Sequence, residues 1–454
     1  MNTNSPKHQP ATTSAGRPRL TVIGTGYLGA THAACMAELG FDVLGLDVDP
    51  EKVAALQAAR VPFYEPGLDE LIAKQVAAGR LRFTTSVEEA ADFGDVHFLC
   101  VGTPQKRGEF AADLRYVDAA VDALAPHLRR PCLVAGKSTV PVGTAARLAE
   151  RLVALAPAGA DVELAWNPEF LREGFAVDDT LRPDRLVVGV TSDHAEEVLR
   201  TVYAPLLDVG VPMVVTDYQT AELVKVSANA FLATKISFIN AMAEVCEIAH
   251  ADVTQLGQAL ALDPRIGGRF LNAGLGFGGG CLPKDIRAFM ARAGELGADQ
   301  ALSFLREVDA INMRRRARMI DLAREQCDGS VLGKRVVVFG AAFKPDSDDI
   351  RDSPALNVAA SLQLQGAQVT VYDPKANDNA RKMYPTLEYA DSALEAADRA
   401  HVVLHLTEWP EFAALDPEVL GRIVATRRIV DGRNALDPAR WRGAGWTYRA
   451  LGRP

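Results

Sequence analysis

A single cysteine follows a glycine cluster in the segment GFGGGCLPKD, residues 276–285. Pro283 suits the first turn of a helix and the following residues keep helical periodicity, so Cys281 is expected just ahead of a helix N-terminus. Unpaired N–H groups there, the helix dipole and the adjacent Lys284 would stabilise a thiolate. The glycines leave room for a substrate, and Asp285, one turn further on, could act as a base through a water molecule or orient a partner. The pattern predicts a nucleophile; the alternative is that Cys281 is a buried spacer in a glycine-shaped loop.

Residues 20–49, LTVIGTGYLGATHAACMAELGFDVLGLDVD, have a pattern typical of a strand, a helix and a second strand. Gly24, Gly26 and Gly29 permit a tight turn and the close approach of a pyrophosphate to the helix N-terminus. Asp47 ends the second strand, where it can hydrogen-bond a ribose hydroxyl and would repel a 2′-phosphate. Glycine turns also arise for steric reasons alone. Because strand, helix, second strand and acid occur together here, the pattern predicts binding of NAD rather than NADP.

Further strand-like runs alternate with helical stretches, which predicts an α/β fold with a doubly wound parallel sheet. Strand ends in such a sheet form the binding edge, so the segments VGTP and KSTVPVGT are expected to line the nicotinamide crevice through Thr103 and Thr139. The alternative is that both threonines are ordinary turn residues. The runs are DVHFLCVGTP (95–104), PCLVAGKSTV (131–140), VELAWNP (162–168) and RLVVGV (185–190).

A nicotinamide cofactor beside a nucleophilic cysteine suggests one reaction. Hydride removal from a primary alcohol gives an aldehyde, thiolate attack gives a thiohemiacetal, a second hydride removal gives a thioester, and water releases an acid. The net change is a four-electron oxidation. Hydrolysis needs a base, and the segment NPEFLREG (167–174) supplies Glu169 and Glu173 behind a strand end. The alternative for this pair is a solvated helical face.

A stretch of strong helix formers, TAELVKVSANAFLATKISFINAMAEVCEIA (220–249), contains neither glycine nor proline. It predicts one long helix that connects two domains. Lys225 and Asn229 share a face of this helix, and a solvated polar stripe is the simplest interpretation of the pair. A second α/β unit opens at KRVVVFGAAFKPDSDDIRDSP (334–354), where a polar loop replaces the glycine fingerprint. We therefore expect two Rossmann-like domains that bind different ligands.

The composition is that of an ordinary soluble protein with more than one domain. The 454 residues are 48% hydrophobic and 24% charged with a net charge of −9, so a nucleic-acid-binding surface is not expected. The N-terminus is polar, and neither a secretory signal nor a membrane-spanning run is found, which favours a cytoplasmic protein without a membrane partner. The six cysteines form no CxxC pair and no His pairing at zinc spacing, so no metal is expected.

Several segments together closely resemble the UDP-glucose/GDP-mannose dehydrogenase family, and within it the UDP-glucose 6-dehydrogenases, in the family's order. They are GTGYLG, FYEPGLDEL, VGTP, KSTVPVGT, NPEFLREG, PDRLVVG, AELVKVSANAF, RIGGRFLNAGLGFGGGCLPKDIRAF and AFKPDSDDIRDSP. The resemblance implies a homodimer or higher homo-oligomer that oxidises UDP-glucose to UDP-glucuronate with two NAD, as in polysaccharide biosynthesis. With the patterns above, it implies a disordered tail (1–18), an NAD-binding Rossmann domain (19–210), a central helical dimerisation domain (211–330) and a UDP-sugar-binding Rossmann-like domain (331–454).

The resemblance also implies roles for individual residues. The implied catalytic residues are Cys281 as nucleophile, Lys225 and Asn229 at the oxyanion, Asp285 and Thr139 at a catalytic water, and Glu169 and Glu173 for thioester hydrolysis or substrate positioning. The implied NAD contacts are Gly24, Gly26, Leu28, Gly29, Asp47, Lys52, Thr103, Thr139, Glu173, Lys284 and Arg351. The implied nucleotide-sugar contacts are Phe170, Leu171, Arg172, Glu173, Lys225, Asn229, Phe270, Leu271, Asn272, Ala273, Gly274, Gly278 and Lys344, with Arg265 donated by a neighbouring subunit.

Two positions beside the cysteine depart from the family's common pattern. Gly280 and Leu282 stand where serine and phenylalanine are usual, and leucine there also occurs in the GDP-mannose branch. Oxidation of GDP-mannose or another nucleotide sugar is therefore the nearest alternative, while the GGHC form associated with N-acetylated sugars is missing. More distant alternatives are a two-electron hydroxyacid dehydrogenase, which needs no thiol, and a sensor of NAD or nucleotide sugars without catalytic activity.

Overall fold

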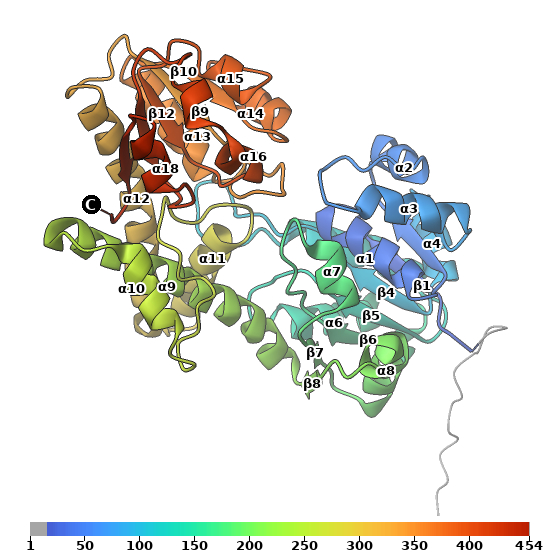
Figure 1. Cartoon of the computed structure of the whole chain (residues 1–454). Helices are drawn as coiled ribbons and strands as arrows, with labels where there is room; N and C mark the ends of the chain where they lie inside the picture. The colour runs from blue at the N-terminus through green and yellow to red at the C-terminus, as the bar shows by residue number, and fades with distance from the viewer. Residues whose placement is uncertain (1–15, 454) are drawn as a thin grey trace, which may run out of the picture. The chain divides into compact units, whose positions relative to one another are not determined.

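The computed structural model describes residues 16–453, which form two compact units (Figure 1). The first unit comprises the chain up to residue 103 together with 113–225, and the second comprises 104–112 together with the chain from 226 onward. Residues 1–15 of the predicted tail lie outside the described part of the chain.

The first unit is built on an eight-stranded sheet with the order β3-β2-β1-β4-β5-β6-β7-β8. Leu20 of β1 lies opposite both Val43 and Val96, so three central strands begin in register. The strands are β1 (Leu20–Ile23), β2 (Val43–Leu46), β3 (Leu81–Thr84), β4 (Val96–Leu99), β5 (Cys132–Gly136), β6 (Val162–Trp166), β7 (Leu186–Gly189) and β8 (Met213–Thr216). All neighbours pair in parallel except β6 and β7, which meet in one antiparallel pair at Trp166 and Gly189. The predicted doubly wound parallel sheet is confirmed, with this one reversal.

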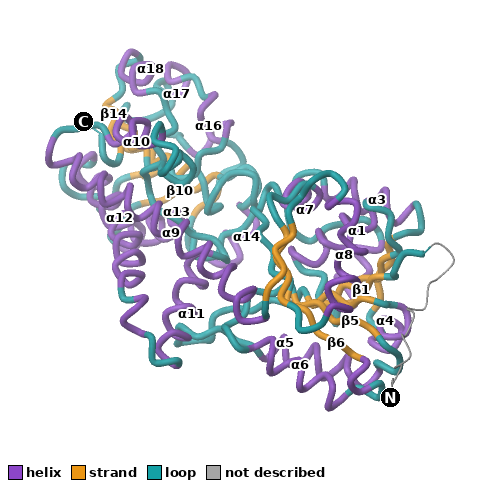
Figure 2. Tube along the Cα trace, turned by 90° about the horizontal axis from the view of Figure 1, so that it is seen from below, coloured by secondary structure: helices purple, strands orange, loops and turns teal. Residues whose placement is uncertain are grey.

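Helices cover both faces of the first sheet, as Figure 2 shows. One hydrophobic layer joins the sheet to α1, α3 and α8, and a separate layer joins its other face to α4, α5 and α6. The inner strands β1, β2, β4 and β5 are buried at every position, as expected for parallel strands that are covered on both faces. The helices are α1 (Tyr27–Glu38), α2 (Pro50–Gln57), α3 (Leu68–Ala77), α4 (Val87–Phe93), α5 (Arg115–Leu124), α6 (Thr144–Leu155), α7 (Ala176–Leu181) and α8 (Asp193–Leu207).

The long helix α9 (Tyr218–Ala249) has 32 residues, begins in the first unit and continues into the second. It confirms the helix that the sequence predicts over 220–249. Three further helices precede the second sheet: α10 (Val253–Ala261), α11 (Leu282–Glu295) and α12 (Phe304–Gln326).

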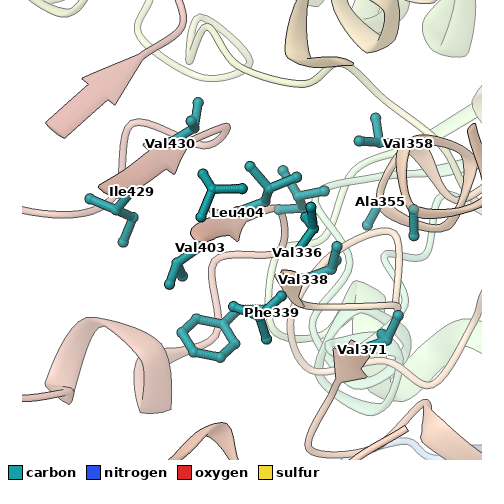
Figure 3. Packing of buried hydrophobic residues seen from close by; sticks show 14 of the residues in the cluster. Val336, Val338, Phe339, Ala355, Val358, Val371, Val403, Leu404, Ile429 and Val430 are labelled. Atoms are coloured by element: carbon teal, nitrogen blue, oxygen red, sulfur yellow. The ribbon is translucent and has the colours of Figure 1, made fainter. Parts of the chain in front are cut away.

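The second unit contains a six-stranded sheet with the order β11-β10-β9-β12-β13-β14, and all its neighbours pair in parallel. Its strands are β9 (Arg335–Phe339), β10 (Gln368–Tyr372), β11 (Glu388–Tyr389), β12 (Val402–His405), β13 (Arg428–Asp431) and β14 (Thr447–Ala450). Its helices are α13 (Pro354–Leu364), α14 (Asn377–Met383), α15 (Ala393–Ala396), α16 (Pro410–Ala414), α17 (Pro417–Leu420) and α18 (Pro438–Gly443). The core of this unit gathers apolar side chains of β9, β10, β12, β13 and α13, among them Val338, Leu404 and Val358 (Figure 3). The predicted second α/β unit is therefore confirmed.

Candidate active site

The glycine turn after β1 has the close packing that its sequence predicts. A Cβ atom at Gly29 would lie 1.8 Å from the carbonyl oxygen of Gly24, so α1 can approach the turn only without a side chain there. Gly24 has φ of 86° and Gly26 immediately precedes α1. A Cβ on Gly26 would meet no atom of the described residues within 4 Å, and no side chain caps the helix N-terminus. This open, uncapped N-terminus fits a pyrophosphate.

Asp47 lies directly after β2 and faces the same turn. Its Oδ2 accepts hydrogen bonds from the backbone N–H of Thr25 at 2.9 Å and from Nζ of Lys52 at 3.0 Å, and its Oδ1 accepts one from the N–H of Asp49 at 3.1 Å. Burial alone would raise the pKa of Asp47, but these donors outweigh it and hold the pKa below its ordinary value. The carboxylate is therefore ionised at neutral pH, which favours a ribose hydroxyl over a 2′-phosphate.

Two threonines predicted at the nicotinamide crevice lie together at the strand ends. Oγ1 of Thr103 donates a 2.6 Å hydrogen bond to the carbonyl of Thr139. Beside them Oγ of Ser138 donates a 2.6 Å bond to the carbonyl of Val101. The loops after β4 and β5 are thus joined at the sheet edge.

Two residues that were predicted separately at the site, Glu169 and Lys225, form an ion pair in the first unit. Nζ of Lys225 lies 3.0 Å from Oε1 of Glu169, and Oε2 of Glu169 accepts a 2.5 Å bond from the N–H of Leu171. The Lys225 ammonium also lies 5.6 Å from the ring centroid of Phe170. The turn after β6 therefore wraps around Lys225, which is only 4% exposed.

The solvated stripe that helical spacing favours for Lys225 and Asn229 is wrong. Asn229 is 8% exposed, so both side chains are buried. Spacing fixes the shared face of a helix but does not reveal what covers that face.

Glu65 joins the glycine turn to the loop that carries Glu173, although it is not among the residues predicted at the site. Its two carboxylate oxygens accept 2.6 Å hydrogen bonds from the N–H groups of Gly174 and Ala176, and the hydroxyl of Tyr27 donates to it as well. Burial, reinforced by Glu65, raises the pKa of Tyr27 well above its ordinary value. Glu65 lies in the segment FYEPGLDEL, which is part of the family resemblance. Its role is not apparent from that segment, because it bonds to the backbone of Gly174 and Ala176, more than a hundred positions away.

Cys281 immediately precedes α11, as predicted, and its thiol side chain is exposed. The other cysteines are buried. Burial raises the pKa of the Cys35, Cys100 and Cys132 thiols to about 12, so these thiols are protonated at neutral pH. Cys281 is thus the cysteine whose position suits reaction.

Asp285 anchors the polar residues around the cysteine helix. It is 2% exposed, and its Oδ2 accepts a 2.6 Å hydrogen bond from Nδ2 of Asn229, while its Oδ1 accepts one of 2.6 Å from Nζ of Lys284. Three residues predicted at the site are thereby connected within the second unit. The amide of Asn229 is held with its nitrogen toward Asp285.

The glycines before Cys281 have a packing role that their sequence pattern does not indicate. A Cβ on Gly278 would lie 2.4 Å from the carbonyl oxygen of Asp352, and one on Gly274 would lie 2.6 Å from that of Gly432. Gly276 and Gly279 have φ of 92° and 83°. The expectation of glycines that chiefly leave room for a substrate therefore needs correction at Gly274 and Gly278, where neighbouring backbone occupies the space.

Asn312 and Arg433 hold the same loop and were not predicted. Asn312 of α12 accepts a 2.8 Å hydrogen bond from the N–H of Phe277 and donates one of 2.9 Å to its carbonyl. Arg433 donates to the carbonyls of Gly276 at 3.0 Å and Phe343 at 3.1 Å. Neither residue has a sequence neighbour in the loop, so only the tertiary structure could identify them.

Gly280, where the family's common pattern has serine, lies against Arg351. A Cβ there would be 2.4 Å from Nη1 of Arg351, whose Nε donates to Oδ1 of Asp349 at 2.9 Å. A side chain at position 280 would therefore require the guanidinium to move.

Other residues predicted to contact the nucleotide sugar or NAD have the following surroundings. Arg172 is paired with Asp179 at 2.6 Å, and Arg265 with Asp263 at 2.6 Å on the surface. Lys344 lies 5.6 Å from the ring centroid of Phe343. Leu271 and Ala273 are buried, Leu28 is partly buried, and Phe270 and Asn272 are exposed.

Comparison with known proteins places this geometry in one family across most of the chain. Residues 18–207 match the NAD binding domain of the UDP-glucose/GDP-mannose dehydrogenase family, residues 219–314 its central domain, and residues 337–438 its UDP binding domain. The chain belongs to the UDP-glucose/GDP-mannose dehydrogenase family. It is accordingly an NAD-dependent oxidoreductase, and the glycine turn with Asp47 lies in the NAD-binding domain.

Individual relatives of this dehydrogenase family align over nearly the whole chain. A UDP-glucose 6-dehydrogenase of Rhizobium meliloti is 42% identical over 438 residues, covering 96% of this chain and 100% of the relative. One of Pseudomonas aeruginosa is 40% identical over 446 residues, covering 96% and 98%. The structure of a UDP-glucose dehydrogenase from Pyrobaculum islandicum superposes with a TM-score of 0.89 at 37% identity, covering 99% of this chain and 100% of that one.

Residues 16–453 contain no group of three or more His, Cys, Asp or Glu side chains arranged to hold a metal ion. In the same range no helix has the length and apolar character needed to span a membrane.

Proposed function

We propose that the protein oxidises UDP-glucose to UDP-glucuronate by a four-electron route through a thioester on Cys281. The observation that carries the proposal is the placement of an exposed thiol at the N-terminus of α11, next to the buried Asp285 with its two donors. The relatives that align over nearly the whole chain bear the name of this activity, which supports the choice of substrate.

Cys281 is the nucleophile in this mechanism. The free N–H groups at the start of α11 and the dipole of its 14 residues favour the thiolate, and Lys284 adds positive charge nearby. The thiolate attacks the aldehyde to form the thiohemiacetal, from which the thioester arises after the second oxidation.

Lys225 and Asn229 stabilise the oxygen that becomes negative in this addition. Both are buried on α9, where a charge or a dipole acts more strongly than in water. Lys225 is held by Glu169 and Asn229 by Asp285, so both donors are fixed before the substrate arrives.

NAD, when bound, supplies the hydride acceptor for both oxidation steps. The open turn at Gly26 and the carboxylate of Asp47 fit its pyrophosphate and adenosine ribose. We assign Leu28, Lys52 and Arg351 to the same cofactor, together with Thr103, Thr139, Glu173 and Lys284.

Hydrolysis of the thioester needs a base and a held water molecule. We assign Glu169 and Glu173 to the support of hydrolysis or substrate positioning, and Asp285 and Thr139 to the water. The backbone bond from Leu171 keeps the Glu169 carboxylate oriented, and the bond from Gly174 to Glu65 fixes the residue after Glu173.

The UDP portion is assigned to the second unit, where residues 337–438 match a UDP binding domain. Oxidation of GDP-mannose remains the second candidate, because Leu282 also occurs in that branch. A coupled assay with purified UDP-glucose, GDP-mannose and other nucleotide sugars separates the two. Two NADH per UDP-glucose support the proposal, whereas turnover of GDP-mannose alone, or one NADH per substrate, contradicts it.

We also propose that the protein is a homo-oligomer that pairs through α9. Four large apolar side chains of this helix are exposed at spacings of three and seven residues, which places them on one stripe. They are Phe231 (66% exposed), Phe238 (48%), Val245 (56%) and Ile248 (84%). Phe238→Asp should shift the mass measured by light scattering toward the monomer, while the matched surface change Gln219→Asp should not. An unchanged mass in both variants would contradict pairing through this stripe.

We also propose a cytoplasmic location, which the proposed mechanism supports. Cys281 must stay reduced to react, which a cytoplasm rich in thiol reductants ensures.

A further inference from the structure

Lys137 is a buried cation that the proposed mechanism does not use. It follows β5, is 6% exposed, and no carboxylate of residues 16–453 lies within ion-pair distance of it. Its Nζ donates to Oδ1 of Asn167 at 3.0 Å and lies 3.5 Å from the hydroxyl oxygen of Tyr203. A buried charge without an ionised partner is costly, so its presence calls for a role beyond packing.

Asn167 connects this cation to the turn that carries Glu169. Its N–H donates to the carbonyl of Gly136 at 2.7 Å and its Nδ2 to that of Val187 at 2.8 Å. The remaining polar atom of the side chain, Oδ1, accepts hydrogen bonds from both Nζ of Lys137 and the hydroxyl of Tyr203. Two residues further on, Glu169 reaches Lys225. Lys137 and Tyr203 therefore fix the base of the turn together from inside the core, and Lys137 is the partner that carries a charge.

Lys137 is also close enough to act on the ion pair by charge. Burial lowers the pKa of Lys137 to about 8, and Glu169 and Lys225 are among the charges that it senses. The other titratable groups that face it are His32 of α1, Cys100 after β4 and Tyr203 of α8.

These three neighbours do not change charge near pH 8. Burial lowers the pKa of His32, raises that of Cys100 to about 12 and raises that of Tyr203 further still. In this group Lys137 itself is therefore the residue that loses charge near pH 8.

We infer that Lys137 is a positioning residue, which holds the turn from Asn167 to Glu169 and sets the charge environment of the Glu169–Lys225 pair. The inference rests on the proposed function, since turnover of the nucleotide sugar is its readout. It has two separable parts, a hydrogen bond to Asn167 and a positive charge.

Two variants separate these parts. Lys137→Met keeps the volume but removes both bond and charge, and should lower kcat about 10- to 100-fold with unchanged NAD affinity. When kcat is plotted against pH, its acid limb should also move to higher pH by about one unit, because loss of a positive charge lets neighbouring groups bind protons more readily. Lys137→Gln keeps a donor for Asn167, so it should restore much of kcat while the acid limb stays displaced.

Stability distinguishes positioning from a merely structural role. The folded protein bears the cost of burying the Lys137 charge, so Lys137→Met should keep or raise Tm. Tyr203→Phe is the control for the charge: it removes the other hydrogen bond to Oδ1 of Asn167 but no charge, so it should leave the acid limb in place.

Wild-type protein that forms no NADH from any nucleotide sugar would refute the proposed function. Active wild type together with a folded Lys137→Met variant of normal kcat and unshifted pH profile would refute the inference alone. If Lys137→Met fails to fold, Lys137→Gln decides, because a normal acid limb in that variant overturns the charge role.

Discussion

Nδ2 of Asn229 donates a 2.6 Å hydrogen bond to Oδ2 of the buried Asp285, so a residue of α9 and a residue of the cysteine helix α11 are locked together. The same carboxylate accepts a bond from Lys284. The hydrogen bond between Asn229 and Asp285 fixes the orientation of the Asn229 amide. It thereby holds one oxyanion donor of the proposed mechanism in place.

Asp285→Asn tests this anchor. The variant removes the negative charge and leaves the Lys284 ammonium without its carboxylate, so kcat should fall about 100-fold while the substrate KM changes little. Steady-state kinetics with UDP-glucose measure both constants. Asp321→Asn, which breaks an exposed pair on α12, is the control and should keep wild-type kinetics. A change in KM with an unaltered kcat would contradict a role for Asp285 in the chemical steps.

Cofactor choice depends on Asp47. In Asp47→Ser the repulsion of a 2′-phosphate is gone and Lys52 loses its carboxylate, so the ratio of kcat/KM for NADP over NAD should rise at least about tenfold. Asp42→Ser, exposed just before β2, provides the matched control and should leave the ratio unchanged. An unaltered ratio in the Asp47 variant would mean that another group selects NAD.

Selective alkylation tests the environment of the cysteines. Brief treatment with iodoacetamide at pH 7 should label Cys281 in the folded protein, because Cys35, Cys100 and Cys132 are buried and protonated. Peptide mass mapping gives the labelled position, and NADH formation should fall in proportion to labelling. Cys281→Ser should bind UDP-glucose yet show no turnover. Early labelling at Cys100 with Cys281 unmodified would contradict the structure.

Gly136 tests the packing beneath the first sheet edge. A Cβ at this position would lie 2.1 Å from Cζ3 of the fully buried Trp166, so Gly136→Ala should lower the free energy of unfolding by about 1–3 kcal/mol. Urea denaturation measures the change. Gly443→Ala at the end of α18, where a Cβ meets no atom of residues 16–453 within 4 Å, should cost little and serves as the control. Equal stabilities for the two variants would show that Trp166 can move aside.

Local patterns predicted most of the fold. Apolar runs alternating with helical stretches gave both sheets, and the absence of glycine and proline gave α9. Pro283 was enough to predict the start of α11 after Cys281. The reversal at Trp166 and Gly189 has no such local signal, since an apolar strand reads the same in either direction.

The site was less predictable, because its contacts join distant segments. Glu65 bonds to Gly174, Asn312 to Phe277 and Arg433 to Gly276, and none of these pairs is linked by a helical or strand period. Burial of Lys225 depends on the turn at Glu169, which helical spacing alone cannot reveal.

The proposed mechanism requires a covalent intermediate on Cys281, which can be detected by its mass. In Glu169→Gln, which lacks the proposed support for hydrolysis, acid quenching soon after mixing with UDP-glucose and NAD should trap the sugar nucleotide on one peptide. We predict a mass increase on the peptide containing Cys281 that requires both ligands and is lost in the double variant with Cys281→Ser. Formation of NADH with that peptide unmodified throughout the reaction would contradict the thioester mechanism.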